Sequence, residues 1–394
     1  MIPARAAPPK KNRWSWRSKA FRSLLYQVLA VALLLAAGAY LLHNTLANMR
    51  LRGIQSGFDF ITQPAGFAIG ESIIPFDSAE SYGKAFLVGL SNTFRVAVVG
   101  IIAATLLGTL LGIGRLSRNF LLRGLSSAYV DLIRNVPLLL QLFIWYFVMT
   151  ELLPPIETAL QPMPDVFFSK NGLQFPHPTW SDGHVFTLIG FVASLFGCWA
   201  WSRFAKRRFE ATGQVVPVLL PALLVIIGVT ALGWLVGGAP AGLDVPEKTE
   251  INVVGGGAVT PEYLTVLLGL VIYTAAYIAE VVRAGIQSVP YGQHEASAAL
   301  GLSRGQALRL VQLPQALRVI IPPMTNQYLN LTKNSSLAVA VGYPDLVSIS
   351  NTSLNQTGRA IECIALVMAC YLTLSLLTSA AMNAYNKRAS IKER

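Results

Sequence analysis

Eight apolar stretches of near-spanning length leave this chain few ways to fold. They cover about 24–42, 86–113, 128–152, 185–201, 215–236, 263–284, 319–341 and 360–382. A helix needs roughly 20 such residues to cross a bilayer. Only 13% of the 394 residues are charged, about half the share found in soluble globular proteins. The sequence therefore predicts an all-α polytopic membrane protein with about eight transmembrane helices.

The distribution of lysine and arginine predicts the topology, because positive residues concentrate in the cytosolic loops of membrane proteins. Twenty-two of the 31 Lys/Arg residues fall in five segments that lie on one side: 1–23, 115–127, 202–213, 283–318 and the tail after 386. We therefore expect a multi-pass protein with its N- and C-termini in the cytosol. This bias accounts for the net charge of +12, so membrane lipid is the expected partner and nucleic acid is not.

The N-terminus is similar to a secretory signal, with basic residues before an apolar run. The run is long and no clear small-x-small cleavage site follows it, so we expect a retained first helix. Cys198, Cys363 and Cys370 all fall within apolar stretches, which predicts neither a disulfide framework nor a metal site.

Three features of the second and third stretches have simple structural explanations. The pair Gly108-x-x-x-Gly112 allows close helix approach, although a chance pair is the alternative. Arg95 is expected to extend outward to the headgroups. Asp131 and Arg134 are three residues apart, so they are expected to pair on one helix surface.

Residues 293–314 form a polar segment between two apolar stretches, called the polar island here. The Ala-rich sequence from Glu295 to Leu300 favours a short helix. Gly301 can take the positive φ that ends this helix. Ser303, with Gln306 three residues later, forms a capping box that starts a second helix. The polar island is therefore predicted to be two short helices joined by a tight bend.

The polar island resembles the EAA loop of ABC-importer permeases. In that loop Glu-Ala-Ala is followed after three residues by Gly, and after nine more by Ile-x-Leu-Pro. Fixed residue types at fixed spacing make the resemblance specific; an ordinary amphipathic hairpin is the alternative. The matching residues are Glu295, Ala296, Ser297, Gly301, Val311, Leu313 and Pro314, with Ser297 and Val311 as mild departures.

Two further stretches resemble the polar-amino-acid subfamily of these permeases, which is HisM/GlnP-like. They are 134–141, which reads Arg-Asn-Val-Pro-Leu-Leu-Leu-Gln, and 273–296. The long layout is similar to the Q-type subunits of general L-amino-acid importers of the Aap/Bzt type. It implies four parts: 1–85, with the basic N-terminus, first helix and periplasmic loop; 86–153, the first part of the permease core; 154–260, an inserted helix pair with periplasmic loops; and 261–394, the second part of the core.

The resemblance implies a five-helix type I importer core in a bacterial inner membrane. Expected partners are a second homologous permease, two copies of an ATPase subunit and a periplasmic amino-acid-binding protein, with L-amino acids as substrates. The ATPase would bind ATP and Mg, and this chain would bind no cofactor. Leu302, Leu308 and Leu310 are expected to be apolar anchors for the ATPase. The implied coupling residues are Glu295, Ala296, Gly301, Leu302, Arg304, Leu313 and Pro314.

Polar residues inside apolar stretches are candidates for a substrate pathway, because lipid penalises them. Four of them share one helical face of the seventh stretch, which is expected to line a pathway or to pack against another subunit: Asn326, Asn330, Lys333 and Asn334. Glu280 is expected to face a substrate ammonium, or else to pair with Arg283 or Arg134. The candidates are Asn92, Arg134, Gln141, Tyr277, Glu280, Asn330, Lys333, Asn334 and Ser335.

Several motifs do not occur in the sequence. It contains no Gly-x-x-x-x-Gly-Lys-Ser/Thr phosphate loop, no nucleophile elbow and no cluster of His or Cys, so we expect no enzyme, no catalytic residue and no metal site. Energy would come from another subunit. The alternatives are an ABC permease for another small solute, such as methionine or phosphate, and a secondary transporter or channel, which would give no reason for the spacing in the polar island.

Overall fold

Six helices of the computed structural model are long and apolar enough to cross a membrane. They are α1 (Lys19–Leu51), α2 (Tyr82–Gly114), α5 (Gly183–Thr212), α6 (Leu219–Val236), α7 (Pro261–Gln287) and α12 (Ala360–Ala389). The structure describes residues 16, 18–51, 53, 56–214, 216–249 and 252–389; most of the basic N-terminal segment and the last five residues lie outside them. Six of the eight predicted spans, and the helical membrane fold, are confirmed.

The third predicted span is not one helix, so that prediction is wrong. It forms α3 (Phe120–Asn135) and α4 (Leu138–Phe147), which meet at 105° and are followed by a π turn, η2 (Val148–Leu152). The break occurs because Pro137 excludes the helical conformation from Val136, which is extended with φ −103° and ψ 127°. The Gln141 amide donates to the carbonyls of Ile133 and Val136 at 3.0 and 2.9 Å, so the break leaves these groups satisfied.

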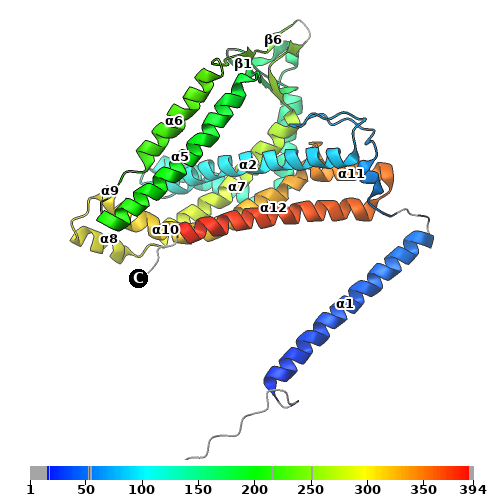
Figure 1. Cartoon of the computed structure of the whole chain (residues 1–394), viewed down its shortest axis with the longest axis horizontal. Coiled ribbons are helices and arrows are strands. Elements are labelled where there is room, and N and C mark those ends of the chain that lie inside the picture. The colour runs from blue at the N-terminus through cyan, green and yellow to red at the C-terminus, as the bar shows by residue number, and fades with distance from the viewer. Residues whose placement is uncertain are drawn as a thin grey trace, which may run out of the picture.

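The seventh predicted span is a helix of a different character. It forms α10 (Leu313–Asn334) and continues as a 3-10 turn, η5 (Ser335–Val341). α10 is absent from the six apolar helices, but it lies beside α7 and α12 in the middle of the bundle (Figure 1). Ala316, Ile320 and Leu331 are buried on its packed side.

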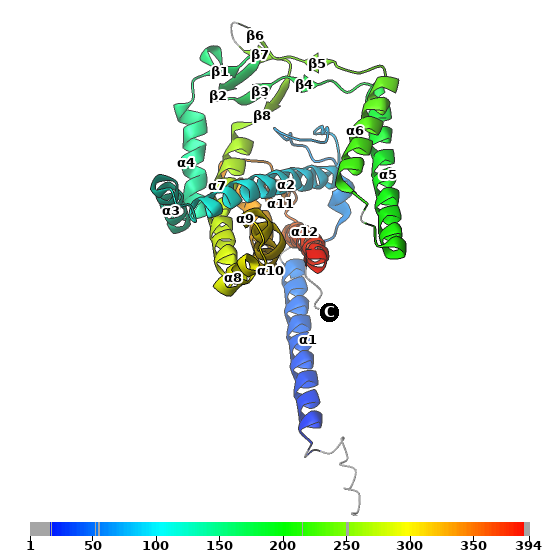
Figure 2. The same ribbon diagram turned by 90° about the vertical axis from the view of Figure 1, so that its left-hand side faces the viewer.

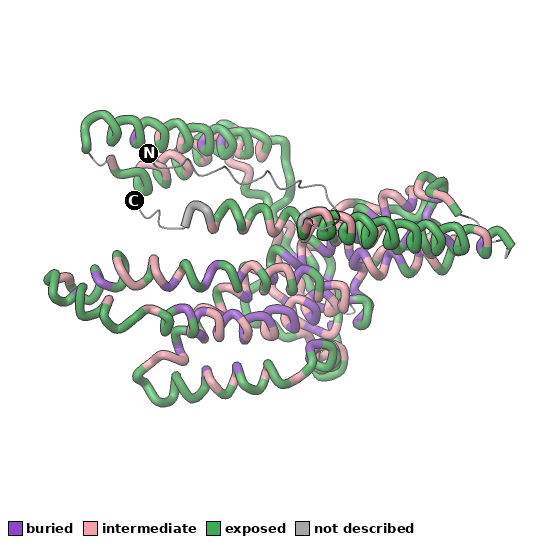
Figure 3. The backbone as a smooth tube through the Cα atoms, turned by 90° about the horizontal axis from the view of Figure 1, so that it is seen from below, coloured by how far each residue is buried: buried purple, intermediate pink, exposed green. Residues whose placement is uncertain are grey.

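The closest helix packing joins α2 to α7. A Cβ added to Gly108 would lie 2.6 Å from Ile278 Cγ2 and 2.8 Å from the Ala275 carbonyl oxygen. A Cβ on Gly112 would lie 2.7 Å from the Ala279 carbonyl oxygen. The two glycines are therefore required for the approach of these backbones, and the packing explanation of this pair is confirmed over chance. Figure 3 shows that buried residues concentrate in this central bundle.

The chain between α1 and α2 folds across one end of the bundle, and residues 56–81 are called the strap. The strap contains one turn, η1 (Asp59–Thr62). Arg359 Nη2 lies 3.0 Å from Asp59 Oδ2, and Glu362 Oε1 accepts from the Gly57 amide at 2.6 Å. These contacts tie the strap to the start of α12. The helix α11 (Leu346–Thr357) lies at the same end, opposite α8 and α9 (Figure 1).

The stretch 154–260 holds the α5–α6 hairpin and three small sheets, which were expected only as Pro/Gly-rich loops. Within the hairpin, a Cβ on Gly190 would lie 2.7 Å from the Val229 carbonyl oxygen. The hairpin and the α3–α4 pair lie on opposite sides of the bundle, with the strands between them at the top (Figure 2). The bounds are η3 (Ile156–Thr158), β1 (Leu160–Met163), β2 (Val166–Ser169), β3 (Gly172–Phe175), β4 (His177–Pro178), β5 (Leu243–Asp244), β6 (Glu247–Lys248), β7 (Val253–Val254) and β8 (Gly257–Val259).

The largest of the sheets is antiparallel, in the order β1-β2-β3-β8. Its register places Phe168 opposite Leu173, and Leu173 opposite Val259. Leu173 and Val259 pack against the helical core, so the sheet fixes where α7 begins.

We predict that Gly108→Val destabilises the protein by about 1–3 kcal/mol, because the added methyl groups overpack the α2–α7 contact. Thermal unfolding of the detergent-solubilised protein measures this. Gly228→Val is the matched control, since no atom lies within 4 Å of a Cβ at Gly228 on α6. Equal melting temperatures for the two variants would contradict the assignment.

Candidate functional site

The polar island folds as the sequence predicts. Its elements are α8 (Tyr291–Ala299), α9 (Arg304–Ala307) and a π turn, η4 (Leu308–Gln312). Gly301 has φ +69°, and the Leu302 amide donates to the Ser297 carbonyl at 3.1 Å across the end of α8. Ser303 and Gln306 form both bonds of the capping box, at 3.4 and 2.9 Å. The two short helices and the glycine bend are confirmed.

Side-chain hydrogen bonds tie the two arms of the polar island together. Gln312 Nε2 lies 2.8 Å from His294 Nδ1, which joins η4 to α8. Gln315 Nε2 donates to Gln293 Oε1 at 3.0 Å, which joins α10 to α8. The His294 ring stacks on Tyr291 with 5.8 Å between ring centroids. These contacts make the polar island one body connected to α10.

Much of the polar island is exposed, including large apolar side chains. Leu308 and Leu310 are exposed as expected of anchors, whereas Leu302 is half-buried. Leu300 is 78% and Tyr291 75% exposed, and the sequence analysis did not single them out. Exposed apolar groups gathered at one end indicate a surface that another protein covers. The remaining implied coupling residues are exposed or half-buried: Glu295, Ala296, Gly301, Arg304, Leu313 and Pro314.

A cluster of charged side chains joins three helices next to the polar island. Arg115, which ends α2, donates from Nη1 to Glu280 Oε2 on α7 at 2.5 Å. Arg115 Nη2 also lies 3.8 Å from Asp131 Oδ1 on α3. Arg283 contacts both oxygens of Glu280, with its Nε 3.2 Å from Oε2. The cluster therefore connects α2, α3 and α7 where α7 leads into α8.

This cluster decides between the two explanations offered for Glu280. The ion pair with Arg283 is present, and Arg115 takes the place expected for Arg134 as the second partner. Arg134 instead lies over the Tyr277 ring, 5.2 Å from its centroid. Asp131 pairs with Arg115, so the predicted helical pair of Asp131 with Arg134 is wrong. The sequence gave no sign of Arg115, because it lies 165 residues from Glu280.

The polar face of α10 remains exposed in the single chain. Asn326, Asn330 and Lys333 are exposed and Asn334 is half-buried, while the opposite side of the helix is packed. A polar face at this depth must meet protein or water, because lipid penalises it.

Three other candidates for the substrate pathway are buried and serve the chain's own fold. Asn92 Nδ2 donates to the carbonyls of Glu71 and Pro344 at 2.8 and 2.9 Å. Ser335 Oγ donates to the Thr332 carbonyl at 2.7 Å. Gln141 satisfies the broken helix described above. The structure does not bring these residues together with the exposed face of α10.

A second buried cluster, at the strap end, was not foreseen. Glu71 of the strap pairs with Arg95, and its Oε2 accepts from Thr260 Oγ1 at 2.5 Å. Arg95 also lies over the Tyr263 ring, 4.0 Å from its centroid. The expectation that Arg95 extends to the headgroups is therefore wrong, because Glu71 and Tyr263 hold it inside. Nearby, burial raises the pKa of Asp345 to about 7.

A multi-spanning helical protein with an exposed, internally braced hairpin at one end belongs to the class of membrane permeases that work with other proteins. Comparison with known families supports this class. Residues 188–391 match the family described as "Binding-protein-dependent transport system inner membrane component".

Several curated relatives match almost the whole chain. The general L-amino acid transport system permease protein AapQ of Rhizobium johnstonii is 44% identical over 386 residues, covering 97% of this chain and 96% of the relative. The putative amino-acid ABC transporter permease protein YhdX of Escherichia coli K12 is 45% identical, covering 98% of each. The glutamate/glutamine/aspartate/asparagine transport system permease protein BztB of Rhodobacter capsulatus is 38% identical, covering 95% of each. The chain therefore belongs to the family of binding-protein-dependent inner-membrane transport components and is a multi-pass ABC-importer permease.

We predict that Glu280→Gln destabilises the protein by about 1–3 kcal/mol, because it leaves the largely buried guanidinium of Arg115 without its main ionic partner. The melting temperature of the solubilised protein tests this. Glu80→Gln is the control, since it breaks an i,i+4 pair with Lys84 on the surface, which is worth less than about 0.5 kcal/mol. If both variants melt together, the cluster does not hold the helices.

Proposed function

We propose that this chain is the permease subunit through which an ATP-driven importer moves L-amino acids from the periplasm to the cytosol. The observation that carries the proposal is near-full-length similarity, at 38–45% identity, to three proteins each named as an amino-acid permease. Neutral zwitterions also suit the amide-rich exposed face of α10 better than an apolar solute would.

We propose the partners that such a permease requires. A periplasmic binding protein delivers the amino acid, a second homologous permease completes the pathway, and two ATPase subunits bind ATP and Mg. The bias of Lys/Arg residues supports cytosolic termini and a cytosolic polar island. The exposed Tyr291, Leu300, Leu308 and Leu310 support docking of the island in an ATPase groove.

In this proposal the polar island acts as a lever. Its arms are braced to each other by the His294–Gln312 bond and to α10 by the Gln293–Gln315 bond. It is also continuous with α7, which the Glu280 cluster connects to α2 and α3. A rigid movement of the island by the ATPase would therefore shift four helices together, as alternating access requires. Glu280 holds helices in this mechanism and does not contact the substrate.

We assign substrate contact to Asn330, Lys333 and Asn334 on α10. The Lys333 ammonium would pair with the substrate carboxylate, and the two amides would hydrogen-bond the same end of the molecule. Since this face is exposed in the single chain, the partner permease would cover its other side.

The test is uptake by proteoliposomes that contain the complete complex. Labelled L-glutamate or L-glutamine should accumulate only with internal ATP and external binding protein. Identification of the ATPase, permease and binding protein that co-purify with the chain completes the test. Amino-acid uptake that proceeds without ATP, or its absence from an intact, ATP-hydrolysing complex, would refute the proposal.

We predict that Gly301→Val abolishes uptake while the protein remains inserted. A β-branched residue at φ +69° costs about 1–2 kcal/mol and favours a different bend, which misaligns the two short helices. Gly213→Val is the matched control, since Gly213 has the same φ, and neither glycine has an atom within 4 Å of an added Cβ. Glu295→Lys, which reverses an exposed charge of the island, should also abolish uptake. Uptake retained by both island variants would remove the lever.

We predict that Lys333→Met lowers the uptake rate about 10–100-fold, because a charge-assisted hydrogen bond worth about 1.5–3 kcal/mol is lost. Basal ATP hydrolysis should be unchanged. Lys84→Met, which removes an exposed lysine at the strap end of α2, should transport normally. Normal uptake by Lys333→Met would move the carboxylate contact elsewhere.

A further inference from the structure

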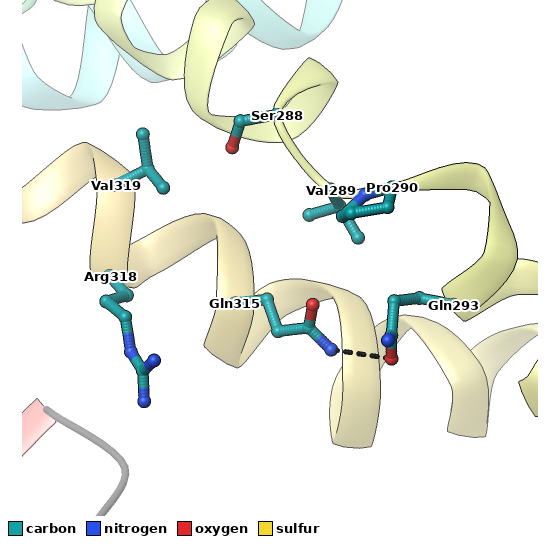
Figure 4. A pocket seen from close by; sticks show the side chains of 7 residues that line it. All are labelled: Ser288, Val289, Pro290, Gln293, Gln315, Arg318 and Val319. Carbon is teal, nitrogen blue, oxygen red and sulfur yellow. Dashed lines mark hydrogen bonds between the residues drawn. The ribbon is translucent and has the colours of Figure 1, made fainter.

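A hollow of about 420 Å³ lies at the joint between the polar island and the bundle. It is called the joint hollow here, and its volume falls within the range of about 300–1,000 Å³ typical of small-molecule sites. Its walls come from the end of α7, the start of α8 and the first turns of α10 (Figure 4). The lining residues are Ser288, Val289, Pro290, Gln293, Gln315, Arg318 and Val319.

The lining of the joint hollow favours a small anion. Arg318 is the one charged residue among the seven, and none of them is a carboxylate. Gln293 and Gln315 add amide groups that both donate and accept, and Val289, Pro290 and Val319 supply apolar contact. A guanidinium beside amide groups suits a carboxylate, while the amide oxygens suit an ammonium. An amino acid carries both groups on one small frame.

The joint hollow lies where the lever meets its load. The Gln315–Gln293 bond, 3.0 Å long, crosses from α10 to α8 at its edge, and the two side chains point toward each other (Figure 4). Arg318 extends from α10 about one turn beyond Gln315. A molecule bound here would contact α7, α8 and α10 together and so favour the one arrangement in which all three line the hollow.

We propose that the joint hollow binds a free L-amino acid on the cytosolic side and thereby slows its own import. This inference rests on the proposed function, which supplies both the cytosolic orientation and the identity of the product. The amino acid carboxylate is held by Arg318, and its ammonium by the Gln293 and Gln315 amide oxygens. Occupancy holds the polar island against α10 until the internal concentration falls. An open hollow with one charged group suits weak binding, with a Kd near about 1 mM.

The test is uptake by proteoliposomes loaded with ATP and with increasing unlabelled L-glutamine inside, while labelled L-glutamine and binding protein are outside. At an internal concentration about ten times Kd, about nine tenths of the hollows are filled, so the initial rate should fall about tenfold. The Arg318→Gln and Gln315→Leu variants should keep their rate under the same load. Arg123→Gln, which removes an exposed arginine of α3 that does not line the joint hollow, should be inhibited like the parent.

A measurement without transport accompanies this test. L-glutamine should raise the melting temperature of the solubilised complex, in the absence of binding protein, by a few degrees at about ten times Kd. Arg318→Gln should lose the shift. Inorganic phosphate should give none, because it has no ammonium for the amides.

Three outcomes would overturn the proposal. They are uptake by the parent that is indifferent to internal L-glutamine, inhibition that persists in both hollow variants, and an equal thermal shift with phosphate. The first differs from a failure of the proposed function, in which the parent would take up no amino acid even from empty vesicles.

Discussion

The approach of α2 to α7 is the contact on which the rest of the structure depends. Gly108 and Gly112 allow the two backbones to meet, and no other residue type fits there. Each end of this pair then carries a cluster of charge: Arg115 with Glu280 at one end, and Arg95 with Glu71 at the other. Because α7 continues into the polar island and α2 begins at the strap, the pair links the two faces of the membrane through one rigid axis.

Low-dielectric surroundings explain where the polar groups of the bundle lie. An unsatisfied polar group in such surroundings costs several kcal/mol, so Gln141, Asn92 and Glu280 each have partners within the chain. Asn330 and Lys333 differ, since they remain exposed on α10. The distinction between satisfied and exposed polar residues separates groups that hold the fold from groups that are available to a ligand or another subunit.

Local features were predictable from the sequence, and long-range pairings were not. The capping box at Ser303, the bend at Gly301 and the glycine pair of α2 depend on residues a few positions apart, so their spacing carries the information. Pro137 marked a weak point in a helix, but nothing in the sequence indicates an angle of 105°. The pairing of Glu280 with Arg115 depends on how distant helices are placed. The sheet strands, of two to four residues, are too short to give a period.

The α5–α6 hairpin has a consequence for the direction of everything that follows it. Two helices cross and return, so the chain leaves the hairpin on the same face at which it entered, and α7 begins at that face. The parity of the crossings is thus even, and a unit of this kind can be gained or lost without inverting the downstream half of the molecule. Removal of α6 alone would reverse that half and present residues 293–314 to the opposite compartment, where nucleotide is not available to drive them.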